Sequence, residues 1–219
     1  MKLFPSIISA NLLNLESVIR TIDSHVDGYH IDIMDDHFVP NLTWGPMFVA
    51  ALRTVTNRPF QIHLMVDNPA TWISRLACAA GDSFVFHVEA VNTSQVSPVL
   101  AAAKQAGWRV GLALNPATEI ERVGLYLAQL DEVMIMSVNP GFSGQSFIDT
   151  SAKAPALRAL SSRLGVTAPL IAMDGGVGLQ NIGMLALAGI DLVGVASAIF
   201  SGLDPVKNIQ NLRQAACCQ

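Results

Sequence analysis

The sequence is poor in cysteine, aromatic residues and charge. Its 219 residues include three cysteines, 6% aromatic residues and 14% charged residues. The three cysteines, of which Cys217 and Cys218 are adjacent, form no disulfide framework, so we expect a reducing, cytoplasmic location. Lysine and arginine are scattered and the net charge is −4, so we expect no nucleic-acid partner. No apolar run reaches the roughly 18 residues of a membrane helix, so we expect no membrane partner.

Hydrophobic residues, in contrast, make up 51% of the chain. A chain of this length and composition can bury a large core, which should be mainly aliphatic because aromatic residues are few. No linker, charge block or low-complexity tract divides it. We therefore expect a single domain over residues 1–219.

Short apolar segments alternate with longer amphipathic ones along the chain. The predicted strands cover residues 3–9, 28–34, 59–65, 83–88, 109–114, 132–138, 170–174 and 191–196. The predicted helices cover residues 15–25, 46–55, 70–80, 97–106, 120–130, 150–164, 179–188 and 206–215. Eight strand–helix units without hairpins require parallel strands, so we predict an α/β fold of the (β/α)8 TIM-barrel class. An open doubly wound sheet is the alternative, but no G-x-G-x-x-G turn follows the first strand.

Start signals support several of these helices. The signals are Asn14, Asn68 with Pro69, a capping box at residues 118–121, and Asp204 with Pro205. Two of the longer connections, residues 35–44 and 139–149, follow the second and sixth strands. Both leave the carboxyl ends of strands, where a barrel places its active site.

Histidine and aspartate gather on strand faces that should point into the barrel. Alternation places His30, Asp32 and Met34 on one face, and Gln61, His63 and Met65 on one face of the next strand. Asp174 ends the seventh strand. Any one of these residues alone is more simply explained as a satisfied core histidine or a capping aspartate. Together, His30, Asp32, His63 and Asp174 form an N₂O₂ set suited to one divalent metal ion: Zn²⁺, Fe²⁺, Mn²⁺ or Co²⁺.

Glycine-rich turns at the same end of the barrel indicate an anion site. They are Gly141 to Gly144, Gly175 with Gly176, and Ala196 with Ser197. The loops after strands seven and eight are the usual phosphate site of such barrels. No lysine or arginine lies in these loops, so backbone N–H groups would bind the phosphate. An ordinary flexible loop is the alternative for residues 141–144.

Two features that the sequence lacks argue against two classes of enzyme. No lysine ends a strand, which argues against a Schiff-base aldolase, and no G-x-S-x-G elbow supports a serine hydrolase. A metal beside two carboxylates suits proton removal next to a carbonyl. One aspartate would remove the proton to give a metal-stabilised enediolate, and the other would return a proton to the opposite face. Met34, Met65 and Met136 could pack on this intermediate, although core filling explains each equally well.

Ordered sequence blocks along the chain resemble the ribulose-phosphate 3-epimerase family. The blocks are PSIISA (5–10), HIDIMD (30–35), HFVPNLT (37–43), HLMV (63–66), LNPAT (114–118), MSVNPGF (136–142), GQSF (144–147) and DGGV (174–177). The resemblance implies an isomerase of the pentose phosphate pathway, with a ribulose-phosphate-binding barrel, that interconverts ribulose 5-phosphate and xylulose 5-phosphate. It also implies a sugar-phosphate substrate and a homo-oligomer.

The resemblance assigns roles to individual residues. His30, Asp32, His63 and Asp174 match the metal ligands, with Asp32 as proton acceptor and Asp174 as donor in one direction. Ser6 matches a substrate-binding serine, and Gly141, Phe142, Ser143, Gly144, Gly175, Gly176 and Ser197 match phosphate-binding segments. We add His63, Met34, Met65, Met136 and Ala196 to the expected substrate-binding residues because of their positions on the strands and in the turns. The loop after the sixth strand matches a lid.

Two departures from the family pattern leave alternatives open. Ala196 stands where the family usually has glycine, and Asp36 stands where asparagine or glycine is common. The related D-allulose-6-phosphate 3-epimerases share the core motifs, so a hexulose phosphate is an alternative substrate. A barrel that binds a sugar phosphate with little catalysis is the other alternative.

Overall fold

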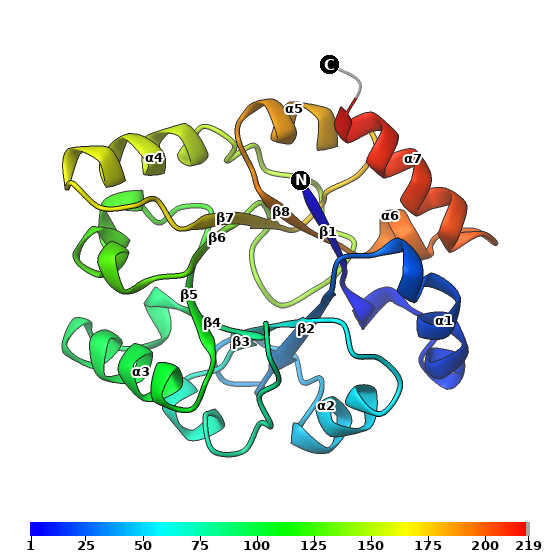
Figure 1. Ribbon diagram of the computed structural model, residues 1–219, viewed down its shortest axis with the longest axis horizontal. Helices are drawn as coiled ribbons and strands as arrows, with labels where there is room; N and C mark the ends of the chain where they lie inside the picture. The colour runs from blue at the N-terminus through cyan, green and yellow to red at the C-terminus, as the bar shows by residue number, and fades with distance from the viewer. Residues whose placement is uncertain (218–219) are drawn as a thin grey trace.

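Eight parallel strands form the inner wall of the protein. The computed structural model describes residues 1–217, and its strands form one sheet in the order β1-β8-β7-β6-β5-β4-β3-β2. The strands are β1 (Lys2–Pro5), β2 (Tyr29–Met34), β3 (Phe60–Met65), β4 (Ser83–His87), β5 (Arg109–Leu114), β6 (Glu132–Met136), β7 (Leu170–Asp174) and β8 (Leu192–Val195). A parallel bridge between Ser6 and His30 joins β1 to β2 and completes the ring. Figure 1 looks into this barrel, which confirms the predicted fold class.

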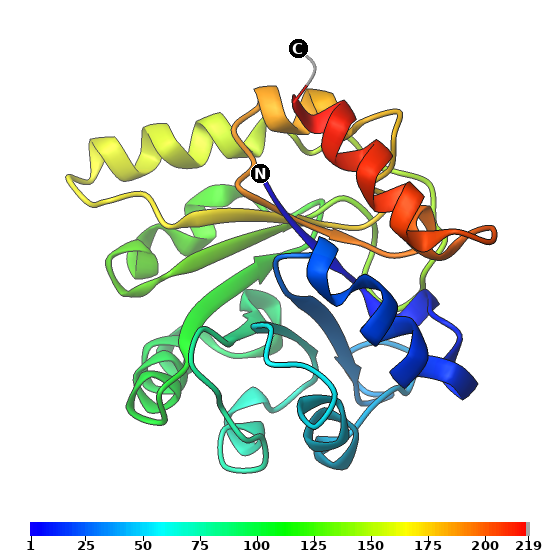
Figure 2. The ribbon, with the colours of Figure 1, turned by 45° about the vertical axis from the view of Figure 1, so that its right-hand side comes forward.

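Helices surround the strands on the outside, as the tilted view of Figure 2 also shows. They are α1 (Leu15–Ile22), α2 (Pro46–Arg53), α3 (Thr93–Gln105), α4 (Lys153–Arg163), α5 (Ile182–Leu187), α6 (Ser197–Phe200) and α7 (Pro205–Cys217). Among residues 1–217 no helix combines the length and apolar character needed to cross a membrane. Cys218 lies outside the described residues.

Two predicted α-helices are wrong. Residues 70–80 contain only the 3₁₀ helix Pro69–Trp72 followed by turns, and the N–H of Ala79 donates to the Asp82 side chain rather than to a helical carbonyl. Residues 120–130 form a 3₁₀ helix, Ile120–Gln129, without the predicted capping box. The hydroxyl of Thr118 instead donates to Glu89, 29 residues away. At Thr118 a contact with Glu89, distant in the sequence, overrides the local signal, whereas at Ala79 the competing carboxylate of Asp82 is only three residues away.

The other start signals have mixed outcomes. Asp204 accepts the N–H of Lys207 at 2.9 Å and Pro205 is the first residue of α7, as predicted. Asn14 precedes α1 and Asn68 precedes the 3₁₀ turn, but neither side chain caps its helix. α3 begins four residues earlier than predicted because Asn92 and Gln95 form a capping box there.

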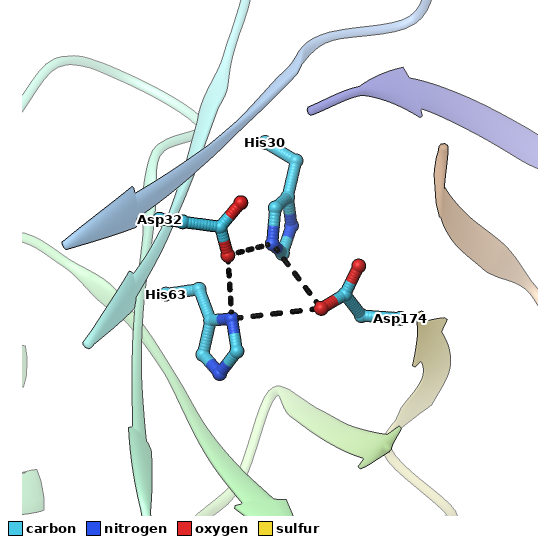
Figure 3. A group of neighbouring side chains, drawn as sticks. All are labelled: His30, Asp32, His63 and Asp174. Carbon is cyan, nitrogen blue, oxygen red and sulfur yellow. Dashed lines mark hydrogen bonds and ion pairs between the residues drawn. The ribbon is translucent and has the colours of Figure 1, made fainter. Parts of the chain in front are cut away.

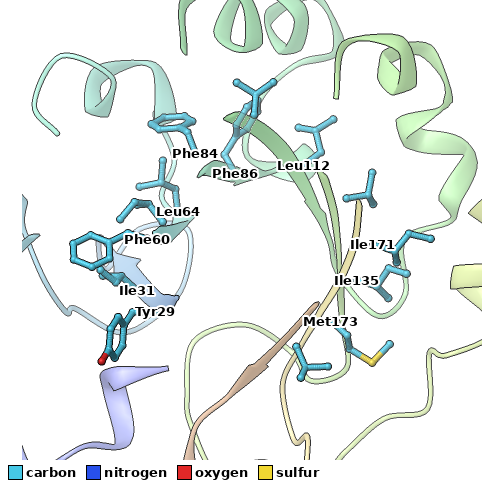
Figure 4. Packing of buried hydrophobic residues seen from close by; sticks show 14 of the residues in the cluster. Tyr29, Ile31, Phe60, Leu64, Phe84, Phe86, Leu112, Ile135, Ile171 and Met173 are labelled. Atoms are coloured by element: carbon cyan, nitrogen blue, oxygen red, sulfur yellow. The ribbon is translucent and has the colours of Figure 1, made fainter. Parts of the chain in front are cut away.

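Alternation along the strands creates two separate apolar layers. Side chains on the outer face, including Ile31, Phe60, Phe86 and Ile135, pack against the helices, as Figure 4 shows. A smaller cluster fills the barrel interior, with members Phe4, Val85, Ala113, Met134, Met136, Val138, Ala172 and Leu192. The outer layer supplies most of the hydrophobic stabilisation, at about 1.5–3 kcal/mol for each fully buried large side chain. Because the inner cluster is small, inward-facing polar side chains can gather at the barrel mouth.

Candidate active site

Two histidines and two aspartates converge inside the barrel mouth. His30 and Asp32 come from β2, His63 comes from β3, and Asp174 ends β7. One nitrogen or oxygen from each side chain lies within 4.8 Å of those of the other three. Figure 3 shows the four side chains pointing toward one another, with Asp32 and Asp174 on opposite sides of the group. The strands thus bring together the whole predicted ligand set.

Asp32 is the most heavily bonded member of the group. Its Oδ1 lies 2.9 Å from Nε2 of His30 and 3.0 Å from Nδ1 of His63. Its Oδ2 accepts the hydroxyl of Ser6 at 2.6 Å. Asp174 is looser, because its Oδ2 lies 3.8 Å from both ring nitrogens. The Asp174 carboxylate therefore has more freedom to reorient than that of Asp32.

The two carboxyl groups differ in their electrostatic environments. Burial opposes ionisation of Asp32, but the charge and hydrogen bond of His30, together with those of His63, hold its pKa far below the ordinary range. Burial raises the pKa of Asp174, and the charge of Asp32 adds to this effect. Burial alone would lower the pKa of His30, but Asp32 and Asp174 raise it to about 10. Burial lowers the pKa of His63. Such opposed shifts in a carboxyl pair are typical of acid–base sites.

The donor chemistry fits a divalent metal ion. Imidazole nitrogen and carboxylate oxygen are ligands that Zn²⁺, Fe²⁺, Mn²⁺ and Co²⁺ accept. Both rings are fully buried and Asp32 is 5% exposed. Buried charged groups need a partner or a bound cation. The four residues are therefore the group in this structure that could hold the metal.

Glycine at position 194 makes room for Asp174. Gly194 of β8 lies beside Asp174 in the sheet. A Cβ atom there would lie 2.8 Å from Oδ1 of Asp174 and 3.4 Å from Nδ1 of His30. Any larger residue would push the carboxylate aside. The sequence analysis did not single out this position, because no local pattern marks it.

A pocket at the barrel mouth opens onto the two carboxylates of the group. Asp32 and Asp174 line it, whereas the buried rings of His30 and His63 do not. Its wall contains every other residue predicted to bind substrate: Ser6, Met34, Met65, Met136, Gly141, Phe142, Ser143, Gly144, Gly175, Gly176, Ala196 and Ser197. It also contains residues that the sequence analysis missed: Ile8, Val138, Pro140, Gln145, Val177 and Gly194.

The three methionines line the pocket while staying almost fully buried. Met34 and Met65 pack with Val39 and Phe38, and Met136 belongs to the barrel interior. Each is at most 3% exposed. Flexible thioether side chains can adapt to the shape of a ligand, so they give the pocket an apolar, adaptable part of its wall.

The loop after β6 covers one side of the pocket. The Gly141 carbonyl accepts the side-chain amide of Asn41 at 2.7 Å, and the hydroxyls of Ser143 and Ser9 lie 2.8 Å apart. Gly176, with φ +61°, packs so closely on this loop that a Cβ would lie 2.9 Å from Cα of Phe147. A left-handed backbone in close contact requires glycine here. The loop and the turn after β7 thus form one wall.

The sequence analysis gave no role to the side chains behind the two histidines. Nδ1 of His30 lies 2.6 Å from Oε1 of Gln61, and the amide of Gln61 donates to Glu132. Nε2 of His63 lies 2.8 Å from Nε2 of His87. The alternation that marks His30 and His63 also points Gln61 and His87 inward, so this signal was present in the sequence.

Comparison with known sequences identifies close relatives. Residues 2–200 match the ribulose-phosphate 3 epimerase family. The chain is 39% identical over 212 residues to the ribulose-phosphate 3-epimerase of Escherichia coli K12, covering 95% of this chain and 93% of that one. It is 35% identical over 215 residues to the enzyme of the same name from Bacillus subtilis, covering 97% and 98%.

Solved structures of low sequence identity share the fold. A KGPDC from Streptococcus mutans in complex with D-R5P has a TM-score of 0.71 at 12% identity, covering 98% of this chain and 96% of that one. The 3-hexulose-6-phosphate synthase from Salmonella typhimurium has a TM-score of 0.65 at 18% identity, covering 99% and 98%. At these identities the similarity shows the barrel fold alone.

Proposed function

The chain belongs to the ribulose-phosphate 3-epimerase family, and on that premise we propose that it interconverts D-ribulose 5-phosphate and D-xylulose 5-phosphate. Its relatives are epimerases, so the chain is an isomerase. The observation that carries the proposal is the pair of Asp32 and Asp174, which reach one pocket from β2 and β7. Carboxylates on two sides of a flat intermediate can exchange protons with both of its faces.

The proposed reaction moves one proton at each carboxylate. The Asp32 carboxylate removes the proton from C3 of the ketose, and the electron pair left behind forms an enediolate with C2. Asp174 then donates its proton to the opposite face of C3, which inverts that centre. Asp32 ends protonated and Asp174 ionised, and proton exchange with solvent restores them. In the reverse direction the two residues exchange roles.

His30, Asp32, His63 and Asp174 would hold the divalent metal ion. When bound, the metal supplies Lewis-acid polarisation of the ketone and neutralises the negative charge that develops on its oxygen. The hydroxyl of Ser6 keeps Asp32 oriented, because it donates to the oxygen that faces away from both rings. Zn²⁺, Fe²⁺, Mn²⁺ and Co²⁺ all suit this donor set.

The pocket wall accounts for binding of the rest of the substrate. Gly175, Gly176, Ala196 and Ser197 adjoin the loop that contains Gly144. Their backbone N–H groups would bind the phosphate through peptide dipoles. Met34, Met65 and Met136 would pack on the carbon chain and exclude water, which strengthens the electrostatic interactions near C3.

The proposal includes a cytoplasmic homo-oligomer. The cysteine content supports the reducing location. Leu13, Leu42 and Met47 are 95%, 70% and 87% exposed, which supports burial of apolar surface between subunits. Light scattering of the purified chain measures the assembly: a monomer at micromolar concentration would contradict this part of the proposal.

Proton NMR in D₂O with D-ribulose 5-phosphate tests the function. The metal-loaded chain should exchange the C3 proton and form D-xylulose 5-phosphate. Asp32→Asn and Asp174→Asn should fold normally but lose turnover by about 10²- to 10⁴-fold, because each removes one proton relay. Exchange with D-allulose 6-phosphate alone would identify a hexulose phosphate as the substrate. Binding of both sugars without exchange would mean a binding protein rather than an epimerase.

A further inference from the structure

A buried histidine and a partly buried glutamate lie behind His63. His87 is the last residue of β4 and is fully buried, and Glu89 follows in the 3₁₀ helix Val88–Ala90. Nε2 of His87 lies 2.8 Å from Nε2 of His63, on the side of that ring away from Asp32. Nδ1 of His87 lies 3.3 Å from Oε2 of Glu89. Within residues 1–217 neither of these last two atoms has another partner.

Glu89 is held in place through its other oxygen. Oε1 accepts the backbone N–H of Asn115 at 2.9 Å and the hydroxyl of Thr118 at 2.5 Å. The ammonium group of Lys153 in turn donates to the carbonyl of Thr118 at 2.6 Å. Burial opposes ionisation, but the contacts with His87, Thr118 and Asn115 lower the pKa of Glu89 to about 2. Oε2 is therefore a fixed, negatively charged acceptor that faces His87.

The contact between the two rings allows two arrangements of protons. In the first, His63 carries its proton on Nδ1, facing Asp32, and Nε2 of His87 donates to Nε2 of His63. Nδ1 of His87 then presents a lone pair to the Glu89 carboxylate, which is repulsive. In the second, Nε2 of His63 donates to Nε2 of His87, and the proton of His87 lies on Nδ1 and faces Glu89. The first arrangement satisfies Asp32 but not Glu89. The second satisfies Glu89 and leaves a lone pair on Nδ1 of His63, 3.0 Å from Oδ1 of Asp32, where a bound cation would remove the repulsion between the two atoms.

We propose that His87 and Glu89 are positioning residues that hold His63 in the tautomer able to bind a divalent metal ion through Nδ1. The inference rests on the proposed metal site. Both rings are neutral in both arrangements. The change from the first arrangement to the second therefore requires no proton from outside the two histidines. Phe38 packs against His87 with ring centroids 4.9 Å apart and the ring planes tilted by 41°, which limits the orientations open to the His87 ring. Partners of this kind behind a metal-ligating histidine change metal affinity by about 10- to 100-fold.

Glu89→Gln is the sharpest perturbation. The N–H of Asn115 and the hydroxyl of Thr118 keep the amide oxygen on their side, so the new NH₂ group faces Nδ1 of His87. An amide donor there favours the first arrangement and so opposes the ligating tautomer. Affinity for Co²⁺, measured on the full chain without substrate by competition with a chelator, should fall about 10- to 100-fold.

A double-mutant cycle separates positioning from general damage. If Glu89 acts through His87, the variant with both His87→Gln and Glu89→Gln binds Co²⁺ as His87→Gln alone does. Asp191→Asn is the matched control, because Asp191 is a hydrogen-bonded carboxylate at the other end of the barrel. It should bind Co²⁺ within about threefold of wild type. Circular dichroism would check that each variant is folded. If His87→Gln does not fold, the Co²⁺ affinities of Glu89→Gln and Asp191→Asn still test the inference.

The outcomes distinguish this inference from the proposed function. Co²⁺ binding by wild type with unchanged affinity in Glu89→Gln would overturn the inference alone, as would losses that add in the double variant. A wild-type chain that binds no Co²⁺ would overturn the proposed metal site and the inference with it. The inference would be established by three results together: weaker Co²⁺ binding in Glu89→Gln, no further loss in the double variant, and normal Co²⁺ binding in Asp191→Asn.

Discussion

Replacement of Gly194 by alanine should impair catalysis without harming the fold. Gly194 lies beside Asp174 on the neighbouring strand, and the new Cβ would lie 2.8 Å from Oδ1 of Asp174. An unstrained contact between such atoms needs about 3.5 Å, so the carboxylate must move by roughly 0.5 Å or more. Asp174 has the looser contacts of the two carboxylates, so it should be the group that moves.

The size of the effect follows from the displacement. A misplacement of about 1 Å can cost about 100-fold in rate, so we expect kcat to fall about 10- to 100-fold. This corresponds to about 1.4–2.7 kcal/mol of transition-state stabilisation. The backbone at position 194 is not in the left-handed region, so alanine adds little backbone strain.

Exchange of the C3 proton of D-ribulose 5-phosphate in D₂O, followed by NMR, measures this effect. Gly124→Ala is the matched control, since its new Cβ would meet Leu160 at an ordinary 3.8 Å. The control should keep the wild-type exchange rate. A folded Gly194→Ala variant that exchanges within threefold of wild type would refute the argument that Gly194 makes room for the Asp174 carboxylate.

Three further predictions concern the metal, acid stability and the core. Removal of divalent metal by a chelator should abolish C3 exchange, and added Mn²⁺ or Zn²⁺ should restore it; full exchange in the chelated chain would contradict a metal requirement. The folded-state pKa of Glu89, about 2, lies below the unfolded value of 4.5, so its stabilisation is present above about pH 4.5 and is lost as the pH falls toward 2. In urea titrations the deficit of Glu89→Gln should therefore be about 2 kcal/mol at pH 7 and close to zero at pH 2, whereas a constant deficit would exclude this linkage. Phe86→Ala should lower the free energy of unfolding by about 3–5 kcal/mol, because Phe86 is fully buried between the barrel and its helices; a loss below 1 kcal/mol would mean that the core repacks.

Local periodicity was sufficient to predict the barrel and its faces. The alternation in β2 places His30 and Asp32 inside and Ile31 outside, and the structure has this arrangement. β5 and β7 have the predicted bounds, whereas β1 ends at Pro5 rather than residue 9 because Ile7–Ser9 turns into a 3₁₀ helix. Strand period is a property of neighbouring residues, so the sequence carries it directly.

Segments in which side-chain contacts replace helical hydrogen bonds could not be predicted from periodicity. Residues 118–121 match a capping box, yet the Thr118 hydroxyl donates to Glu89 on another element. Residues 70–80 contain alanines that favour a helix, yet Asp82 takes the N–H of Ala79. Glu89 is not identifiable as a partner of Thr118 until the barrel is assembled, because the two residues are 29 positions apart, whereas Asp82 competes locally, three residues beyond Ala79.

The sequence by itself determined the strand–helix repeat, the inward faces of β2 and β3, and the residue types suited to a metal and a phosphate. Tertiary structure decided which of these groups meet. Closure of the ring brings Asp174 within reach of His30 and His63, the register of β7 and β8 sets Gly194 beside it, and the end of β4 places His87 and Glu89 behind His63. The physical reason is that periodicity is local, whereas distances between side chains from different strands depend on register and barrel closure.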